Sequence, residues 1–182
     1  MPLLYGLAPV LPPAPRLLIL GSFPSPESLR RRQYYAKNTN RFWRLVGEFL
    51  GEPQLAKASY EVKLSLLSRN GIALWDVIAA CERAGAADSK IRQPQWNPLV
   101  ELLQTQQSLQ RIVLNGSTAA RFFAIAAMNW PGGVCPVPSF SCLSTSAANQ
   151  KYGPWDKLRE NWSPHLSFAL NLADYPAGIT AS

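Results

Sequence analysis

The chain has 182 residues, a length that suits one domain with a sizeable hydrophobic core. Hydrophobic residues make up 47% of the sequence, which excludes a disordered protein. Eighteen Lys and Arg against eleven Asp and Glu give a formal net charge of +7. Such an excess of positive charge favours polyanionic partners, either nucleic acid or an anionic membrane surface.

Local composition argues against several classes of protein. Residues 1–15 are apolar but hold five prolines and no basic start, so we expect an irregular N-terminal arm and not a signal peptide. No stretch of ~18 uninterrupted apolar residues occurs, so no membrane span is expected. With His165 as the single histidine, a zinc site built by the protein is not expected, and neither is a cofactor.

The cysteines indicate a reducing environment. They are three in number, widely spaced and without a CxxC pair, which suits free thiols in a cytoplasmic protein. They are Cys81, Cys135 and Cys142.

Apolar runs and helical periodicities alternate through the first half of the chain. In order, they predict a strand over 16–20, a helix over 40–50, a helix over 56–69, a strand over 72–77, a loop over 89–98 and a short helix over 99–103. Asn40 is the expected N-cap of the first helix, and Gly51 with Pro53 ends it.

The second half repeats this alternation. It predicts a strand over 111–114, a helix from Ser117 or Thr118 to about residue 128, a connection over 129–139, a strand over 140–143, a small-residue loop over 144–149 and a helix over 155–162. We expect residues 163–182 to form a partly helical tail.

This order of elements predicts an α/β fold. We expect a single-domain three-layer sandwich over 16–162, with a mostly parallel central sheet of about four strands flanked by helices. Open α/β sheets bind ligands at the carboxyl ends of their strands. The loops over 23–35, at Asn115 and over 144–149 should therefore meet at one sheet edge and form the active site.

Each local motif has both an ordinary and a functional interpretation. Gly21-Ser-Phe-Pro-Ser25 is neither GxGxxG nor GxSxG, and it can be a simple strand-ending turn. Tyr34 and Tyr35 can be surface packing or can stack on a nucleobase. Asn40 can be a helix cap or can orient a water molecule, and Asn115 can be a turn residue or can read a base edge.

Charge and small residues near the predicted edge have two interpretations as well. Residues 144–149 can be an ordinary polar loop or can contact phosphates through backbone N–H groups. Lys151 and the basic run 30–32 can be solvated surface or can bind a polyanion.

Taken together, these motifs resemble the uracil-DNA glycosylase superfamily, most closely its hypoxanthine-DNA (deoxyinosine) glycosylase branch. The resemblance spans about residues 17–162, and Asn40-Arg-Phe-Trp43 is also similar to the mismatch-specific uracil glycosylases. The motifs that carry it are Ile19-Leu-Gly-Ser-Phe-Pro-Ser25, Gln33-Tyr-Tyr35, Asn40-Arg-Phe-Trp43, Gly71-Ile-Ala-Leu-Trp-Asp76, Ile112-Val-Leu-Asn-Gly116 and Leu143-Ser-Thr-Ser-Ala-Ala-Asn149.

The resemblance implies a role for each matching position. Asn40 matches the amide proposed as catalytic, and Tyr35 matches the aromatic residue that stacks on the flipped base. The implied base-binding residues are Phe23, Tyr35, Asn115 and Ser144. The implied DNA contacts are Ser22, Pro24, Ser25, Gly116, Ser146, Asn149 and Lys151.

The sequence also departs from its relatives. Many of them have Asp or Asn where this chain has Phe23, so the usual water-activating side chain is missing from the first motif. Others have Gly-His-Pro in place of 36–38, His or Asn in place of Ser144, and Pro in place of Ala147. These departures fit the deoxyinosine branch better than efficient excision of uracil.

The expected function is therefore a monofunctional DNA glycosylase that excises a deaminated base, hypoxanthine first of all, in base excision repair. No lysine is clearly placed for a Schiff base, so the expected product is an abasic site. We expect a monomer whose partner is damaged DNA and not a membrane. The alternatives are a uracil- or mismatch-specific glycosylase and a non-catalytic DNA-binding module on the same fold.

Overall fold

A parallel four-stranded sheet forms the centre of the computed structural model, which describes residues 2–149 and 154–170. The strand order is β3-β2-β6-β7, and every neighbouring pair is parallel. The strands are β2 (Leu17–Gly21), β3 (Ile72–Asp76), β6 (Arg111–Asn115) and β7 (Ser139–Cys142). All residues of β2 and β3 are buried, as expected for continuous apolar strands of a parallel sheet.

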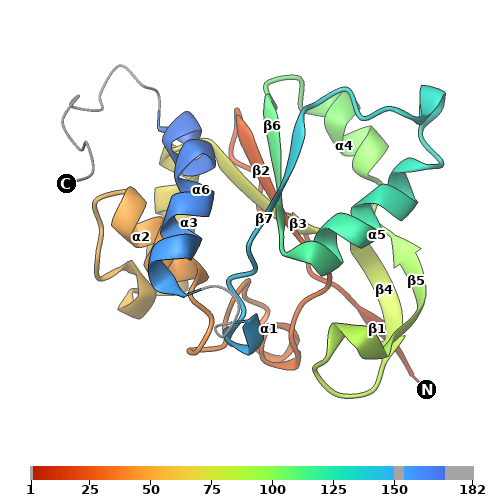
Figure 1. Ribbon diagram of the computed structural model, residues 1–182, viewed down its shortest axis with the longest axis horizontal. Helices are drawn as coiled ribbons and strands as arrows, with labels where there is room; N and C mark the ends of the chain where they lie inside the picture. The colour runs from red at the N-terminus through yellow and green to blue at the C-terminus, as the bar shows by residue number, and fades with distance from the viewer. Residues whose placement is uncertain (1, 150–153, 171–182) are drawn as a thin grey trace.

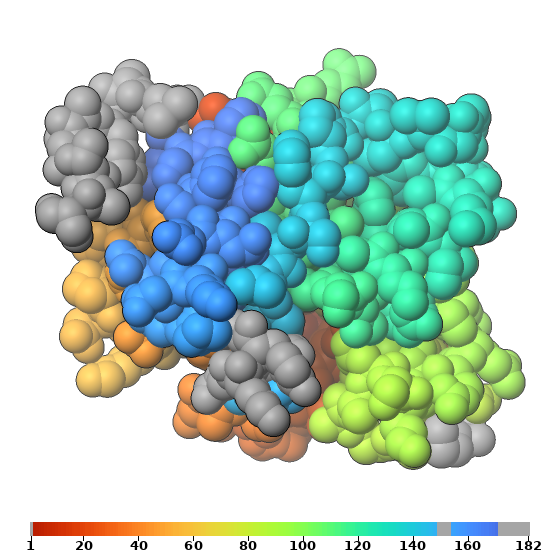
Figure 2. Space-filling view, viewed as in Figure 1, coloured from red at the N-terminus to blue at the C-terminus, as the bar shows by residue number. Residues whose placement is uncertain are grey.

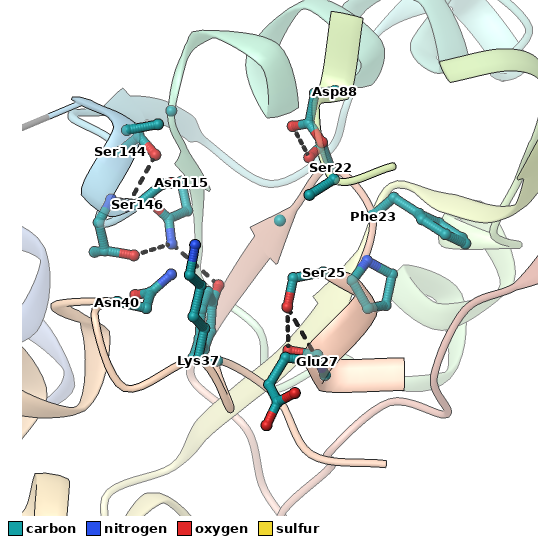
Figure 3. Close-up of a pocket in the computed structure, with 18 of the residues that line it drawn as sticks. Ser22, Phe23, Ser25, Glu27, Lys37, Asn40, Asp88, Asn115, Ser144 and Ser146 are labelled. Atoms are coloured by element: carbon teal, nitrogen blue, oxygen red, sulfur yellow. Dashed lines mark hydrogen bonds between the residues drawn. The ribbon is translucent and has the colours of Figure 1, made fainter. Parts of the chain in front are cut away.

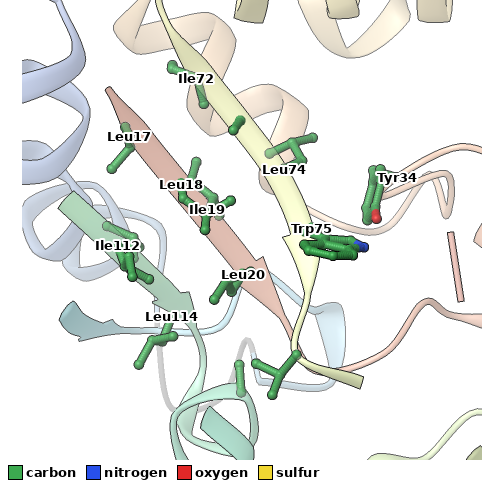
Figure 4. Packing of buried hydrophobic residues seen from close by; sticks show 14 of the residues in the cluster. Leu17, Leu18, Ile19, Leu20, Tyr34, Ile72, Leu74, Trp75, Ile112 and Leu114 are labelled. Atoms are coloured by element: carbon green, nitrogen blue, oxygen red, sulfur yellow. The ribbon is translucent and has the colours of Figure 1, made fainter. Parts of the chain in front are cut away.

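Helices cover both faces of this sheet, which confirms the predicted three-layer α/β sandwich (Figure 1). One face carries α2 (Phe42–Phe49), α3 (Tyr60–Arg69) and α6 (Trp155–Ala169), and the other carries α4 (Leu99–Thr105) and α5 (Ser117–Ala127). Apolar side chains of the central strands pack in rows between these layers, as Figure 4 shows for Leu17, Ile72 and Ile112.

A second, antiparallel sheet was not predicted. It has the order β1-β4-β5 and consists of β1 (Leu3–Tyr5), β4 (Ile78–Arg83) and β5 (Ile91–Trp96). The expected irregular arm therefore contains a strand, and so does the expected loop over 89–98. Pro94 and the exposed polar residues of β5 hide it in the sequence, because proline is confined to edge strands.

Two helices also differ from the prediction. A short helix, α1 (Pro26–Arg31), occupies part of the first loop, and its single buried residue gives no helical periodicity. Helix α6 continues to Ala169, past the predicted end at 162, although Pro164 lies inside it. Burial of Leu166 and Ala169 outweighs the hydrogen bond that Pro164 removes.

The short 3-10 turns complete the described structure. They are η1 (Leu55–Lys57), η2 (Asp88–Lys90), η3 (Pro131–Gly133) and η4 (Ala147–Asn149). The three cysteines are free, as expected. Within the described ranges, no helix has the length and apolar character needed to cross a membrane.

Segments that are distant in sequence meet where the central strands end. In the space-filling view of Figure 2, red residues of the early chain lie between the lime-green residues of β4 and β5 and the blue residues that follow β7. The fold thus brings the first loop, the second sheet and the loop after β7 to one place.

Candidate functional site

The strand register sets three residues side by side at the carboxyl edge of the central sheet. Gly21 at the end of β2 pairs with Asp76 at the end of β3. On the other side, the pairing of Leu20 with Leu114 brings Asn115 of β6 next to Gly21. Because glycine has no side chain, the space above it is taken by the carboxyl group of Asp76, with the hydroxyl of Tyr35 close by.

A pocket of about 900 Å³ opens at this edge, lined by all three residues. The first loop and the loops after β6 and β7 contribute to it, as the sequence predicted, and the loop after β4 adds a further wall. Figure 3 shows the pocket with Asn40, Asn115, Ser144 and Ser146 on one side and Ser22, Asp88 and Phe23 on the other.

Tyr35 is held firmly in the pocket. Its ring stacks on Phe42 with centroids 3.8 Å apart, and its hydroxyl accepts a hydrogen bond of 3.1 Å from Asn115 Nδ2. Burial, and then the charge of Asp76, raise the pKa of Tyr35 above its usual range. The hydroxyl therefore stays protonated, and its own hydrogen remains available to a ligand in the pocket.

Asn115 uses its amide to hold other parts of the site. Besides the bond to Tyr35, Nδ2 donates to Thr145 Oγ1 at 2.9 Å, and Oδ1 accepts from the backbone N–H of Thr145 at 2.9 Å. Both amide donors are thus engaged within the protein. The geometry makes Asn115 a support for Tyr35 and the second loop, and its reading of a base edge stays a prediction.

The second loop, 144–149, lies close to the end of β6 because of Gly116. That glycine has φ = 99°, and a Cβ there would lie 2.8 Å from the Cβ of Ser144. Ser144 Oγ accepts a hydrogen bond of 3.2 Å from the backbone N–H of Ser146. The predicted contacts Gly116, Ser144 and Ser146 therefore come together.

Arg41 joins this loop to the start of α2. Its Nη2 donates to the carbonyl of Ser144 at 3.1 Å, and its backbone N–H donates to the carbonyl of Thr145 at 3.0 Å. Of the other predicted DNA contacts, Asn149 ends η4, and Lys151 lies outside the described residues.

Asn40 lies beside this junction and lines the pocket. Its Oδ1 accepts a hydrogen bond of 2.9 Å from the backbone N–H of Phe42, so it serves the first turn of α2 although Arg41 occupies the N-cap position. Figure 3 shows the side chain directed toward Asn115 and Ser146. Its Nδ2 makes no hydrogen bond in the part of the chain that is described and is available to a ligand or water.

The first loop is fixed by contacts to the second sheet and to α1. Ser22 Oγ donates to Asp88 Oδ2 at 2.5 Å, and the carbonyl of Pro24 accepts from Arg83 Nη2 at 2.7 Å. Ser25 caps α1 by accepting from the backbone N–H of Ser28 at 3.1 Å. These contacts explain how the sequence builds the loop, while DNA binding by Ser22, Pro24 and Ser25 stays a prediction.

Phe23 lines the pocket, but most of its ring is buried. Its ring is only 6% exposed and lies beneath the guanidinium of Arg83, with 4.9 Å between the guanidinium carbon and the ring centroid. Figure 3 shows the ring pointing away from Asn40 and Asn115. Its packing favours a core role, and its contact with a base remains an untested prediction.

Asp76 is the main residue that sequence reasoning missed. It is 5% exposed, lines the pocket, and its Oδ2 has no hydrogen-bond partner among the described residues. Burial, and secondarily the charge of Asp88, raise the pKa of Asp76 to about 8, against a smaller opposing effect of Arg83. The signal available in the sequence was an acid that ends the buried run Ile72–Trp75 at the carboxyl end of a strand.

The charged residues around the pocket form two groups. Arg83 and Asp88 line its wall, with 3.9 Å between Nη1 and Oδ1, while Glu27, Arg31 and Lys37 lie on its rim, where Arg31 forms an ion pair with Glu27. No group of three or more His, Cys, Asp or Glu in residues 2–149 and 154–170 is arranged to hold a metal ion.

Residues 8–162 match the profile of the uracil DNA glycosylase superfamily. The chain belongs to this superfamily. The two segments that the sequence predicts to be its first and second motifs, 21–25 and 144–149, both contribute residues to the pocket.

Members of the superfamily with similar sequences come from two archaea. A hypoxanthine DNA glycosylase of Methanosarcina acetivorans is 39% identical over 81% of this chain and 89% of its own length. A hypoxanthine DNA glycosylase of Methanosarcina barkeri is 35% identical over 80% of this chain and 88% of its own length.

A solved superfamily structure has the same fold. The solution NMR structure of a Methanosarcina acetivorans protein, assigned there to the uracil DNA glycosylases, is 33% identical and superposes with a TM-score of 0.77. The match covers 93% of this chain and 99% of the other.

Proposed function

We propose that this protein is a monofunctional DNA glycosylase that excises hypoxanthine from DNA by hydrolysing the N-glycosidic bond, as a step of base excision repair. The observation that carries the proposal is the similarity to two hypoxanthine DNA glycosylases over 81% and 80% of the chain. The pocket supports it, because an aromatic ring and several polar groups converge where the central strands end.

The base has to leave the DNA duplex before it can reach this pocket. Flipping costs a few kcal/mol, and the cost is lowest for a base that pairs poorly, as a deaminated base does. Tyr35, supported from behind by Phe42, offers the flipped base a stacking surface worth about 1–3 kcal/mol. The net charge of +7, with the exposed Lys37 on the rim, favours the approach of the phosphate backbone.

Cleavage then breaks the bond between C1′ of the sugar and N9 of the base. The bonding electron pair leaves with the base, and the oxygen of a water molecule bonds to C1′ while its proton is released. Negative charge grows on the base, and fixed donors aimed at that charge contribute several kcal/mol. Asn40, with its available Nδ2, orients the water.

The decisive experiment is a panel of duplexes that contain one deoxyinosine, uracil or xanthine, incubated with excess protein under single-turnover conditions. We expect release of hypoxanthine to be fastest, with an abasic site as the product. Binding that falls with salt but releases none of the three bases would instead establish a non-catalytic DNA-binding module and refute the enzymatic proposal.

Uracil is the second candidate substrate, because the matched NMR structure is assigned to the uracil DNA glycosylases. A panel in which uracil leaves faster than hypoxanthine would select that candidate. In either case, we expect the protein to act as a cytoplasmic monomer without a cofactor.

A further inference from the structure

Asp76, a buried acid of the pocket, has no role in the steps of the proposed glycosylase reaction. Asp76 ends β3 directly beside Gly21, and a Cβ on Gly21 would lie only 2.4 Å from Asp76 Oδ1. The carboxyl group thus occupies the space that the missing side chain leaves open. The hydroxyl oxygen of Tyr35 lies 3.8 Å from the position that this Cβ would take. Two oxygen atoms, one from each residue, therefore flank the floor of the pocket.

One oxygen of this carboxyl group, Oδ2, is buried without a hydrogen bond from residues 2–149 and 154–170, while the other, Oδ1, lies above Gly21 at the floor of the pocket. Asp76 is 5% exposed, and Oδ2 has no partner among the described residues, although a buried polar group without a hydrogen bond is costly. The nearby cation does not satisfy it, because Arg83 directs Nη2 to the carbonyl of Pro24 and faces Asp88 through Nη1. An unpaired acid in a pocket that binds a ligand points to a partner on the ligand.

The surroundings determine which form of the acid is present. The charged and titratable groups that face Asp76 are Arg83 and Asp88, from the second sheet and its loop, and Tyr34 and Tyr35, from the segment before α2. Burial and Asp88 raise the pKa of Asp76 to about 8 and Arg83 lowers it, so the neutral acid predominates at pH 7. A neutral carboxylic acid carries an O–H donor.

We propose that the Asp76 carboxyl group donates a hydrogen bond to O6 of the flipped purine. This inference rests on the proposed glycosylase function. A 6-oxopurine presents an acceptor at this position, as guanine does, whereas adenine presents an amino donor. A protein donor at this place therefore accepts hypoxanthine and disfavours adenine, the undamaged base from which hypoxanthine forms by deamination.

The first loop, residues 21–25, contains no acid or amide, and its Phe23 is packed beneath Arg83. Asp76 brings a polar group to the pocket from the neighbouring strand instead. Its role is donation to the base, which differs from activation of water.

The test is single-turnover excision of hypoxanthine by the wild type and by Asp76→Asn and Asp76→Ala, between pH 6 and pH 10. The wild-type rate should fall as the pH rises through about 8 or higher, because ionisation removes the donor. Asp76→Asn keeps an N–H donor and should remain within about fivefold of the wild type at pH 7, without that fall. Asp76→Ala should lose about 10- to 100-fold in rate while keeping its affinity for undamaged DNA.

Two further measurements make the outcome decisive. In Asp76→Ala, the rate of adenine release relative to hypoxanthine release should rise. The matched control is Glu101→Gln, which changes an exposed acid and should leave the rate and its pH profile as in the wild type. If the excision rate of Asp76→Asn falls as far as that of Asp76→Ala, and the wild-type rate rises as the pH passes through 8, then Asp76 acts as a base and the inference is wrong. A wild-type protein that releases hypoxanthine at a rate that does not change near pH 8 also refutes the role of Asp76. A wild-type protein that releases no base refutes the proposed glycosylase function itself.

Discussion

The side-chain amide of Asn115 donates a 3.1 Å hydrogen bond to the hydroxyl of Tyr35, eighty positions earlier in the chain. The bond connects the end of β6 to the segment that leads into α2. It fixes the ring that we propose as the stacking surface, and it leaves the hydroxyl hydrogen free for the ligand.

Asn115 and Tyr35 should therefore behave as one unit. Asn115→Ala should slow excision by about 100-fold, because a small displacement of Tyr35 is enough to lose that much. In a Tyr35→Phe background the same change should cost less, since the bond to Tyr35 is already gone and only the two bonds to Thr145 are lost. A double-mutant cycle on single-turnover rates measures this coupling, and additive effects would show that the two residues act independently.

Gly116 should tolerate no side chain. Strain from the positive φ alone should lower the free energy of unfolding of Gly116→Ala by about 1–3 kcal/mol, and the clash with Ser144 should lower it further. Gly51→Ala is the matched control, since Gly51 also has a positive φ but nothing within 4 Å of an added Cβ. Urea unfolding of both variants separates clash from strain, and equal losses would contradict the close approach of the second loop.

Asn40 allows its structural and chemical roles to be separated. Asn40→Ala should lose the hydrogen bond to Phe42, which lowers the free energy of unfolding by about 1 kcal/mol. It should also lower the excision rate by at least about 100-fold. Asn40→Asp keeps the acceptor for Phe42 but loses the amide donor. It should thus keep the stability and lose the rate, and an active Asn40→Asp variant would disprove the assignment to Nδ2.

Lys37 tests the monofunctional mechanism, since it lines the pocket as an exposed residue. Lys37→Ala should excise hypoxanthine at close to the wild-type rate. The slope of log K for DNA binding against log salt concentration should become shallower by about one unit, because one phosphate contact is lost. Borohydride should trap no covalent complex with either protein. A trapped complex that disappears in Lys37→Ala would mean a Schiff base.

The protonation of Asp76 should also appear in the stability of the protein. Its pKa rises from 3.8 to about 8 on folding, so between these values the folded state binds a proton that the unfolded state has lost. Stability contributed by this group therefore falls as the pH rises from about 4 to 8 and stays low above that. Asp76→Asn should be more stable than the wild type at pH 8, with a smaller difference at pH 5. Urea unfolding at both values checks this, and a difference that does not grow with pH would contradict the raised pKa.

The parallel sheet was predictable because its strands are continuous apolar runs, such as Leu17–Leu20, which only a doubly covered sheet buries. The position of the pocket followed from the same pattern, since the carboxyl ends of parallel strands share one edge. The second sheet was not predictable, because β5 is short, polar and interrupted by Pro94.

Within the site, the sequence indicated Tyr35 in a loop, Asn40 at a helix start and Asn115 at a strand end, and the family resemblance implied their roles, but neither could indicate their partners. Hydrogen bonds such as that from Asn115 to Thr145 depend on tertiary contact between segments that are distant in the chain. The same holds for Asp76, whose raised pKa results from burial and from Asp88, neither of which a linear pattern displays.

The anchoring of Arg41 to the second loop has a mechanical consequence. Its backbone N–H and its guanidinium both hold carbonyls of that loop, at Thr145 and Ser144, and Asn40 is its direct neighbour in the chain. If the loop contacts DNA as predicted, a strand that displaces it should also displace Asn40, whose amide we propose to orient the water. Binding of the DNA backbone and alignment of the reaction would then be one movement, and a strand bound in the wrong position would leave the reacting groups misaligned.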